Sequence, residues 1–168
     1  GCHPSRVIFD TGGGGKEHAD RLRLQGFPVR TVAFGSQIVI EPRRSLVQVN
    51  ERKDMKEEQR AFKNRRAQMY WDLRTLLDPQ GDPVESTVQT FALPRYYRET
   101  EHGRKTLPEQ MSPINLDYDE DGKMYVIPKN KKDANDTRRC LTELIGHSPD
   151  ELDALVLAVH GMLYKETR

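Results

Sequence analysis

Two aspartates occupy positions where a carboxylate could hold a divalent cation. Asp10 ends an apolar run and precedes Thr11 and four glycines, whereas Asp153 is the only polar side chain between Leu152 and Val159. A carboxylate carried toward a protein core is costly unless a hydrogen bond, an ion pair or a metal compensates it. Carboxylate oxygens are the ligands that hard cations such as Mg²⁺ and Mn²⁺ prefer. The pattern is therefore compatible with a metal site, and a structural ion pair between Asp153 and an arginine is the alternative.

The elements that must position Asp10 are predicted from the N-terminal part of the chain. Residues 6–10 are apolar enough for a buried strand, residues 16–25 carry a helical pattern that stops at Gly26, and residues 28–34 alternate as a second strand. A strand, a helix and a strand in this order form a unit with parallel strands. The glycine-rich loop lacks the spacing and the hydroxyl residue of a nucleotide-binding P-loop, so that class of site is excluded.

The element that must position Asp153 is a predicted C-terminal helix. Ser148 is expected to be its N-cap, with Pro149 at the first helical position and Glu151 completing a capping box. Capping explains Glu151 but not Asp153, which lies further into the helix. His147 precedes the cap and could approach a metal site, although a loop histidine is also compatible with a structural role.

Three further elements are predicted between these ends. Residues 54–77 carry the apolar stripe of a long helix, and residues 114–118 and 123–127 flank an acidic turn, which predicts a hairpin. Residues 131–145 are expected to be helical in part, whereas residues 37–50 are ambiguous between a strand and a loop. Helices and strands mixed in this order predict an α/β fold.

Charge is spread unevenly along a chain whose net charge is only +1. Residues 43–66 carry nine basic side chains against four acids, and residues 123–139 carry six against two. Such segregation suits a face that binds a polyanion, although a solvated face is also compatible with it. Arg65 and Arg66 stand beside an aromatic pair, and the arginine fork suits phosphate because it donates two hydrogen bonds at once.

Size and composition indicate one intracellular domain. A chain of 168 residues fits a single domain. Its two cysteines have no metal-ligand spacing, which favours a reducing compartment. No apolar run approaches the ~18 residues of a membrane span, and the N-terminus has no signal-peptide pattern. We therefore expect a soluble protein of the cytoplasm.

Four stretches follow one another in an order that matches the motifs of a known family. The first is an apolar strand that ends in an aspartate, followed by the glycine-rich loop, a helix and a second strand. The others read Asn-Arg-Arg-Ala-Gln-Met-Tyr-Trp, Gly-Lys-Met-Tyr-Val-Ile-Pro-Lys and Ser-Pro-Asp-x-x-Asp-Ala-Leu, and the four lie at residues 7–35, 64–71, 122–129 and 148–155. Together they resemble the nuclease domain of the terminase large subunit of tailed phages, the motor that packages DNA into procapsids.

This resemblance implies a ribonuclease H-like fold, in which a mixed sheet is flanked by helices. It also implies an endonuclease that cuts concatemeric double-stranded DNA by two-metal hydrolysis with Mg²⁺ or Mn²⁺. By the same resemblance, Asp10 and Asp153 are metal ligands and catalytic residues, and Asp150 is an auxiliary catalytic candidate. The residues implied to contact the DNA backbone are Arg65, Arg66, Lys129 and Lys131.

The resemblance further implies an assembly and a location. The intact terminase would bind a small subunit and a portal in the cytoplasm of a bacterial host, with prophage DNA as one origin of such a chain. The family's fold begins with a strand that carries a first catalytic aspartate, and an ATPase domain precedes it. Neither has a counterpart here, so we expect residues 1–168 to be a partial nuclease domain with weak or no cutting activity alone.

Two other readings of the same residues stay open. Another ribonuclease H-like nuclease, of the resolvase or integrase type, would share Asp10 and Asp153 but prefer branched DNA. A non-catalytic packaging module, which docks a portal or small subunit, would neutralise Asp153 with a basic side chain.

Overall fold

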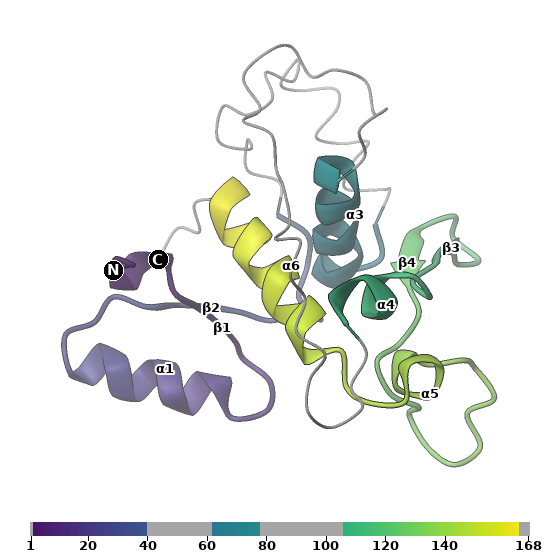
Figure 1. The fold of residues 1–168 in the computed structure, drawn as a ribbon, viewed down its shortest axis with the longest axis horizontal. Helices are drawn as coiled ribbons and strands as arrows, with labels where there is room; N and C mark the ends of the chain where they lie inside the picture. The colour runs from purple at the N-terminus through teal and green to yellow at the C-terminus, as the bar shows by residue number, and fades with distance from the viewer. Residues whose placement is uncertain (1, 40–61, 78–105, 165–168) are drawn as a thin grey trace, which may run out of the picture.

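The computed structural model describes residues 2–39, 62–77 and 106–164. These residues form a mixed α/β fold, which confirms the α/β class expected from the sequence. Two helices, α3 (Arg65–Leu77) and α6 (Asp150–Leu163), lie side by side at its centre (Figure 1). The other elements flank this pair on opposite sides, so α3 and α6 form the frame of the molecule.

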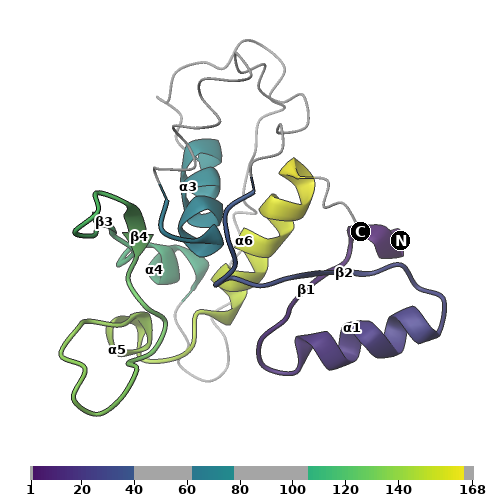
Figure 2. The same ribbon diagram turned by 180° about the vertical axis from the view of Figure 1, so that it is seen from behind.

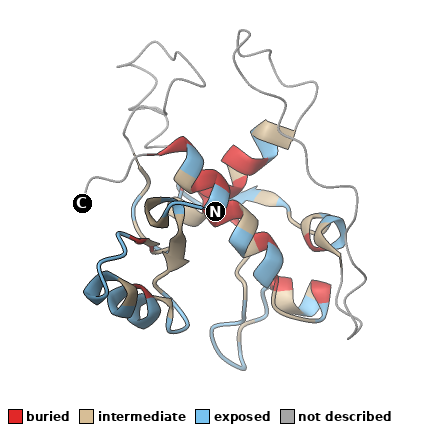
Figure 3. Cartoon of the chain, turned by 60° about the vertical axis from the view of Figure 1, so that its left-hand side comes forward, coloured by how far each residue is buried: buried red, intermediate tan, exposed pale blue. Residues whose placement is uncertain are grey.

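A strand–helix–strand unit lies on one side of α6, as the sequence predicts. A short 3₁₀ helix (Pro4–Arg6) leads into β1 (Ile8–Asp10), which is followed by α1 (Gly15–Leu24) and β2 (Arg30–Val32). The two strands pair in parallel, and β1 contacts both α1 and α6 (Figure 2). In α1 only Ala19 is buried, and Figure 3 shows the rest of this helix at the surface. The carboxyl end of β1 is therefore carried by a strand that packs directly on α6.

The glycine-rich loop after β1 requires glycine at a close backbone approach. A Cβ atom on Gly15 would lie 2.0 Å from the carbonyl oxygen of Asp10. Backbone at that distance cannot move aside as a flexible side chain could. Gly15 therefore lets the start of α1 lie against the end of β1, which fixes the backbone around Asp10.

A substitution at Gly15 tests this close approach. Gly15→Ala should lower the free energy of unfolding by about 1–3 kcal/mol, the usual cost of forcing extra atoms into a filled space. Urea denaturation measures the change. Gly35→Ala is the matched control, because a Cβ atom there meets nothing within 4 Å. Equal stability of the two variants would contradict the tight packing of this loop.

Helix α6 buries a continuous apolar stripe. Leu152, Val156, Val159 and Leu163 repeat at helical spacing and are at most 4% exposed. They join one cluster with apolar side chains of α3. Burying each such side chain stabilises the fold by roughly 1.5–3 kcal/mol relative to leaving it in water. Neither α6 nor another helix of the described residues is long and apolar enough to cross a lipid bilayer.

Helix α6 is also tied to the parallel strands. The guanidinium of Arg30 donates hydrogen bonds to the carbonyl oxygens of Gly161 at 3.1 Å and Tyr164 at 3.0 Å. A Cβ atom on Gly161 would lie 1.8 Å from Cδ1 of Ile8, so the end of this side chain of β1 packs into the space that the glycine leaves. These contacts fix how the strand that carries Asp10 lies against the helix that carries Asp153.

A hairpin and two short helices lie on the other side of the central pair. Strands β3 (Leu116–Tyr118) and β4 (Met124–Val126) form the predicted antiparallel hairpin. Helix α5 (Leu141–Ile145) is the helical part of the segment predicted before α6. Helix α4 (Leu107–Met111) is not among the predicted elements, and Thr106 opens it with a capping box.

The described strands form two separate pairs rather than one mixed sheet. One pair, β1–β2, is parallel and the other, β3–β4, is antiparallel. Residues 38 and 39, from the ambiguous segment, are not a strand. The side chain of Gln68 instead accepts from the backbone N–H of Val39 and donates to its carbonyl, each at 2.9 Å. The side chain of Gln68 thus makes the two hydrogen bonds to the backbone of Val39 that a neighbouring strand could make.

The predicted capping of α6 is wrong. The helix begins at Asp150, and Pro149 rather than Ser148 is its N-cap. The Ser148 hydroxyl bonds the side chain of Asp150, and Glu151 accepts a hydrogen bond from Gln110 of α4 at 2.9 Å. Both side chains of the expected capping box therefore serve other partners.

The helix predicted over residues 54–77 begins later than expected within the described residues. Within the described residues it begins at Arg65, because Phe62 forms a bridge with Met124 of β4 instead of joining the helical stripe. The side chain of Asn64 accepts a hydrogen bond from the N–H of Ala67 at 3.0 Å, as N-cap residues do. Residues 54–61 lie outside the described residues, as does most of the basic stretch over residues 43–66.

Candidate functional site

Both carboxylate oxygens of Asp153 are engaged. Oδ1 accepts a hydrogen bond from the hydroxyl of Tyr70 at 2.8 Å, and Oδ2 lies 2.8 Å from the ammonium of Lys129. Tyr70 comes from α3 and Lys129 from the segment after β4, so three distant parts of the chain meet here. The side chain of Asp153 is only 14% exposed, which explains its need for partners. The ion pair considered from the sequence is present, but its cation is a lysine rather than an arginine.

The Lys129 ammonium bridges two carboxylates. It lies 3.2 Å from Oδ1 of Asp150, one turn before Asp153 in α6. Burial works against the charged form of Lys129, but hydrogen bonds and charge from the two aspartates outweigh burial and raise the pKa of Lys129 above its ordinary value. Lys129 is therefore the resident cation of this aspartate pair, and its contact with DNA stays a prediction.

Tyr70 is a site residue that the sequence does not single out. Its side chain is buried, and the guanidinium carbon of Arg66 lies 5.2 Å from the centre of its ring. Burial raises the pKa of the Tyr70 hydroxyl; the charge of Arg66 opposes this shift and that of Asp153 adds to it. The hydroxyl therefore stays protonated and donates to Asp153. Its position four residues after Arg66, on the same face of α3, is the signal that could have revealed it.

The two arginines predicted to contact DNA both make contacts within the protein. Arg66 donates to the carbonyl of Ile127 at 3.0 Å, which joins α3 to the end of β4. Arg65 donates to the carbonyl of Gln37 at 3.0 Å, which joins α3 to the segment after β2. Arg66 therefore lies on the side of Lys129, and Arg65 holds a different part of the fold.

A cleft of about 760 Å³ opens beside Lys129, between the β3–β4 hairpin and the start of α3. We call it the hairpin cleft. Its lining carries four basic and three acidic side chains, and the acids stand on the turn of the hairpin. The lining residues are Lys63, Asn64, Arg66, Tyr118, Asp119, Glu120, Asp121, Tyr125, Val126, Pro128, Lys129 and Arg138. Lys129 thus lines the hairpin cleft and also contacts Asp153 and Asp150; we call Asp150, Asp153, Lys129 and Tyr70 the Asp153 cluster.

Asp10 is placed at the carboxyl end of β1. Its Oδ1 accepts a hydrogen bond from the N–H of Gly12 at 3.1 Å, so the carboxylate lies against the glycine-rich loop. Strand β1 contacts α6, the helix that carries Asp153. The hydrogen bonds of Asp10 are separate from those of Asp153, and a cation shared by the two stays a prediction.

The site offers two carboxylates, those of Asp150 and Asp153, as oxygen ligands for a cation. Within residues 2–39, 62–77 and 106–164, no three histidine, cysteine, aspartate or glutamate side chains gather closely enough to hold a metal ion. Asp150 and Asp153 form a pair, and the Lys129 ammonium marks where they attract a positive charge. Mg²⁺ is commonly bound through one or two carboxylates and keeps several waters. Metal binding by this pair stays a prediction, because the Lys129 ammonium already lies against both carboxylates.

Lys131 and His147 have partners outside the Asp153 cluster. The ammonium of Lys131 lies 2.6 Å from Oε1 of Glu143 in α5. Nδ1 of His147 forms a hydrogen bond with the carbonyl of Ser148 at 2.7 Å. These contacts fix the loops on either side of α5, and the roles expected from the sequence stay predictions.

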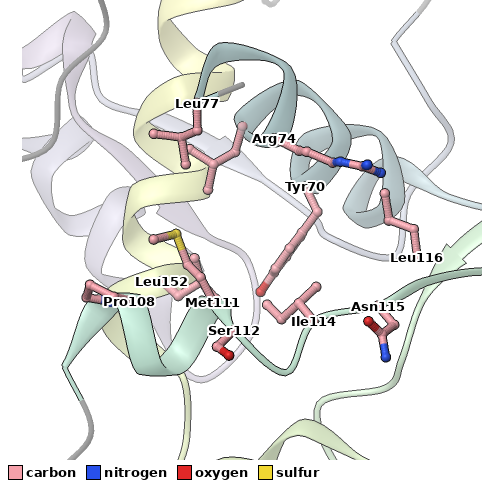
Figure 4. Close-up of a pocket in the computed structure, with 11 residues that line it drawn as sticks. Tyr70, Arg74, Leu77, Pro108, Met111, Ser112, Ile114, Asn115, Leu116 and Leu152 are labelled. Carbon is pink, nitrogen blue, oxygen red and sulfur yellow. The ribbon is translucent and has the colours of Figure 1, made fainter. Parts of the chain in front are cut away.

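A second pocket, of about 690 Å³, lies beside Tyr70 between α3, α4 and α6 (Figure 4). Apolar side chains dominate its wall, and one cation, Arg74, stands among them. The lining residues are Tyr70, Leu73, Arg74, Leu77, Pro108, Met111, Ser112, Ile114, Asn115, Leu116 and Leu152. Tyr70 therefore borders this pocket while its hydroxyl bonds Asp153.

Comparisons with known proteins do not add to this picture. No family model, curated protein or solved structure matches the chain.

The Asp119 carboxylate shapes the rim of the hairpin cleft and gives a pH-dependent prediction. The backbone N–H of Lys123 donates to it at 2.9 Å, and the Lys63 ammonium lies 3.2 Å away. The Lys123 bond, helped by Lys63 against the effect of burial, lowers the pKa of Asp119 below its ordinary value of 3.8. Its contribution to stability is thus present above the unfolded pKa and lost as the pH falls through the folded one.

Asp119→Asn should therefore be less stable than the wild type at pH 7, and the difference should shrink as the pH falls below 3.8. Urea denaturation at a series of pH values measures it. Glu120→Gln, on the same turn, is the control for loss of one negative charge. If the difference in the free energy of unfolding between the two proteins stayed constant as the pH fell below 3.8, the carboxylate form of Asp119 would not stabilise this turn.

Proposed function

We propose that this chain is the nuclease domain of a DNA-packaging terminase, with a ribonuclease H-like fold, and that it hydrolyses phosphodiester bonds of double-stranded DNA. Its motifs resemble that family in residue type and in order. The positions of three of these motifs support the proposal, because they lie in a strand that ends in Asp10, in a hairpin and in the helix that carries Asp153. In the proposal Asp10 and Asp153 bind the metal and Asp150 assists.

One observation carries this proposal: Lys129 lines the hairpin cleft and also bonds Asp153. A phosphate held in the cleft by Lys129 and Arg66 would lie next to the aspartate pair. Contacts of this kind hold the backbone of DNA without reading its bases. Two carboxylates beside a surface that holds a phosphate would suit metal-dependent phosphodiester hydrolysis.

In the proposal Asp153 exchanges the Lys129 ammonium for a metal ion. Bound Mg²⁺ or Mn²⁺ would supply charge neutralisation at the phosphate and a lowered pKa of water. Lys129 now lies against Oδ2 of Asp153, so its ammonium must turn away when a metal ion is held there. In the hairpin cleft the ammonium of Lys129 could then bind a phosphate of DNA. Lys129 would then contact DNA, the role that the resemblance implies.

The proposal places the domain in a packaging motor. The whole assembly would include a small subunit, a portal and concatemeric DNA in the cytoplasm of a bacterial host. Cutting at the end of packaging needs little sequence preference. Phosphate contacts from Arg66 and Lys129 suit that requirement, since they are independent of base sequence.

A non-catalytic interaction module is the second candidate. The observation that favours it is the Lys129–Asp153 ion pair itself, because a basic side chain already neutralises the carboxylate. In that case Tyr70, Lys129 and Asp153 would simply join α3, β4 and α6. The two candidates differ in whether a divalent cation displaces Lys129.

Thermal unfolding with and without Mn²⁺ decides between them. At a hundredfold excess over the dissociation constant, a ligand of the folded state stabilises it by about 2.7 kcal/mol. Mn²⁺ should therefore raise the melting temperature of the wild type and leave that of Asp153→Asn unchanged. Nicking of plasmid DNA in Mn²⁺, absent in the same variant, is the second readout.

Asp20→Asn is the matched control for this experiment. Asp20 is an exposed aspartate on α1 that pairs with Arg23 at 3.1 Å, away from the hairpin cleft. It should respond to Mn²⁺ as the wild type does. No change in melting temperature for any of the three proteins would exclude the metal-dependent nuclease and favour the interaction module.

A further inference from the structure

A pocket between α3, α4 and α6 takes no part in the proposed nuclease reaction, and we call it the apolar pocket (Figure 4). Its volume of about 690 Å³ falls among those of pockets that bind small organic molecules, which measure about 300–1,000 Å³. Such pockets are mostly apolar and carry a few polar groups that orient the ligand. The apolar pocket has this composition, so its side chains indicate what kind of molecule it would hold.

Part of the wall belongs to the protein core. Leu73 of α3 is 3% exposed and Leu152 of α6 is fully buried. Partly buried apolar side chains from the ends of α3 and α4 and from residues 114–116 complete the wall; they are Leu77, Met111, Ile114 and Leu116. A molecule that covered these side chains would remove apolar surface from water, which favours binding.

Arg74 is the one charged side chain among the residues that line the apolar pocket. It is exposed on α3, and its guanidinium carbon lies 5.2 Å from the centre of the Trp71 ring. Within the described residues no carboxylate forms an ion pair with it. Its positive charge is therefore available to an anionic ligand. The guanidinium suits an anion with two or more oxygens, because it donates two hydrogen bonds at once.

Figure 4 shows the charged and the apolar parts of the wall on different sides. Arg74 and Asn115 lie on the right of the view, whereas Leu77, Pro108 and Met111 lie on the left. A ligand that matches both sides would have an apolar body and one anionic group at its end. A molecule that is polar throughout, such as inorganic phosphate, does not match, because burying polar groups against apolar walls is costly.

We propose that the apolar pocket is a binding site for a small organic anion, whose apolar body contacts the aliphatic wall and whose anionic group pairs with Arg74. The side-chain amide of Asn115, on the same side as Arg74, is a further hydrogen-bond donor. This binding is separate from the proposed nuclease, since it needs neither a divalent cation nor DNA.

Two dyes that differ in one charge test the proposal. Phenylnaphthylamine is neutral and apolar, and anilinonaphthalenesulfonate adds one sulfonate to the same rings. Both fluoresce strongly in apolar surroundings, so titration of the chain with each dye in EDTA gives a dissociation constant without metal. We expect the wild type to bind both dyes, because both cover the aliphatic wall, and only the anionic dye to depend on Arg74.

Arg74→Gln should raise the Kd of the anionic dye roughly fivefold, the effect of losing one exposed ion pair, and leave that of the neutral dye unchanged. Arg21→Gln is the matched control and should change neither, because Arg21 is an exposed arginine of α1, away from α4 in Figures 1 and 2. Met111→Trp places a larger side chain in the wall and should weaken both dyes. Circular dichroism checks that each variant is folded, since the anionic dye also binds partly folded proteins.

A weaker anionic dye alone in Arg74→Gln, with both dyes weakened in Met111→Trp, supports the inference. An unchanged anionic dye in Arg74→Gln overturns it, and so does a wild type that binds neither dye. Self-association that Met111→Trp abolishes, with no dye bound, would assign the pocket to a second copy of the chain and also overturn the inference. None of these outcomes bears on the proposed nuclease, which has its own Mn²⁺ test.

Discussion

The carboxylate of Asp153 is the point where the described parts of the chain are joined. Tyr70 of α3 and Lys129 from the segment after β4 each bind one of its oxygens at 2.8 Å. A largely buried carboxylate cannot be left without partners at low cost. This one group therefore joins α3, α6 and the segment after β4, in addition to the apolar cluster that α3 and α6 share, and it holds Lys129 at the edge of the hairpin cleft.

The elements with a strong local pattern could be predicted from the sequence. The unit of β1, α1 and β2 follows from apolar strands on either side of a helical pattern, and the hairpin follows from two short strands around an acidic turn. Helix α6 follows from its apolar stripe. Asp153 was correctly expected to need compensation, because no other polar side chain interrupts residues 152–159.

The partners of these elements could not be predicted, because they depend on contacts between distant residues. Tyr70 and Asp153 are 83 positions apart, and Lys129 is 24 positions from Asp153. The capping box expected at Ser148 fails for the same reason, since Gln110 of α4 competes for Glu151. Local rules supply candidate hydrogen bonds, and tertiary contacts decide which of them form.

In the proposed nuclease, Asp10 and Asp153 serve one cation. Paramagnetic Mn²⁺ broadens nearby amide signals in ¹⁵N NMR spectra, and the amides of Gly12 and Asp153 report on the two carboxylates. The amide of Leu24, at the far end of α1, is the internal control. We expect the amide signals of Gly12 and Asp153 to broaden at the same low Mn²⁺ concentration while the signal of Leu24 persists. Broadening at Asp153 without Gly12, or at neither, would contradict it.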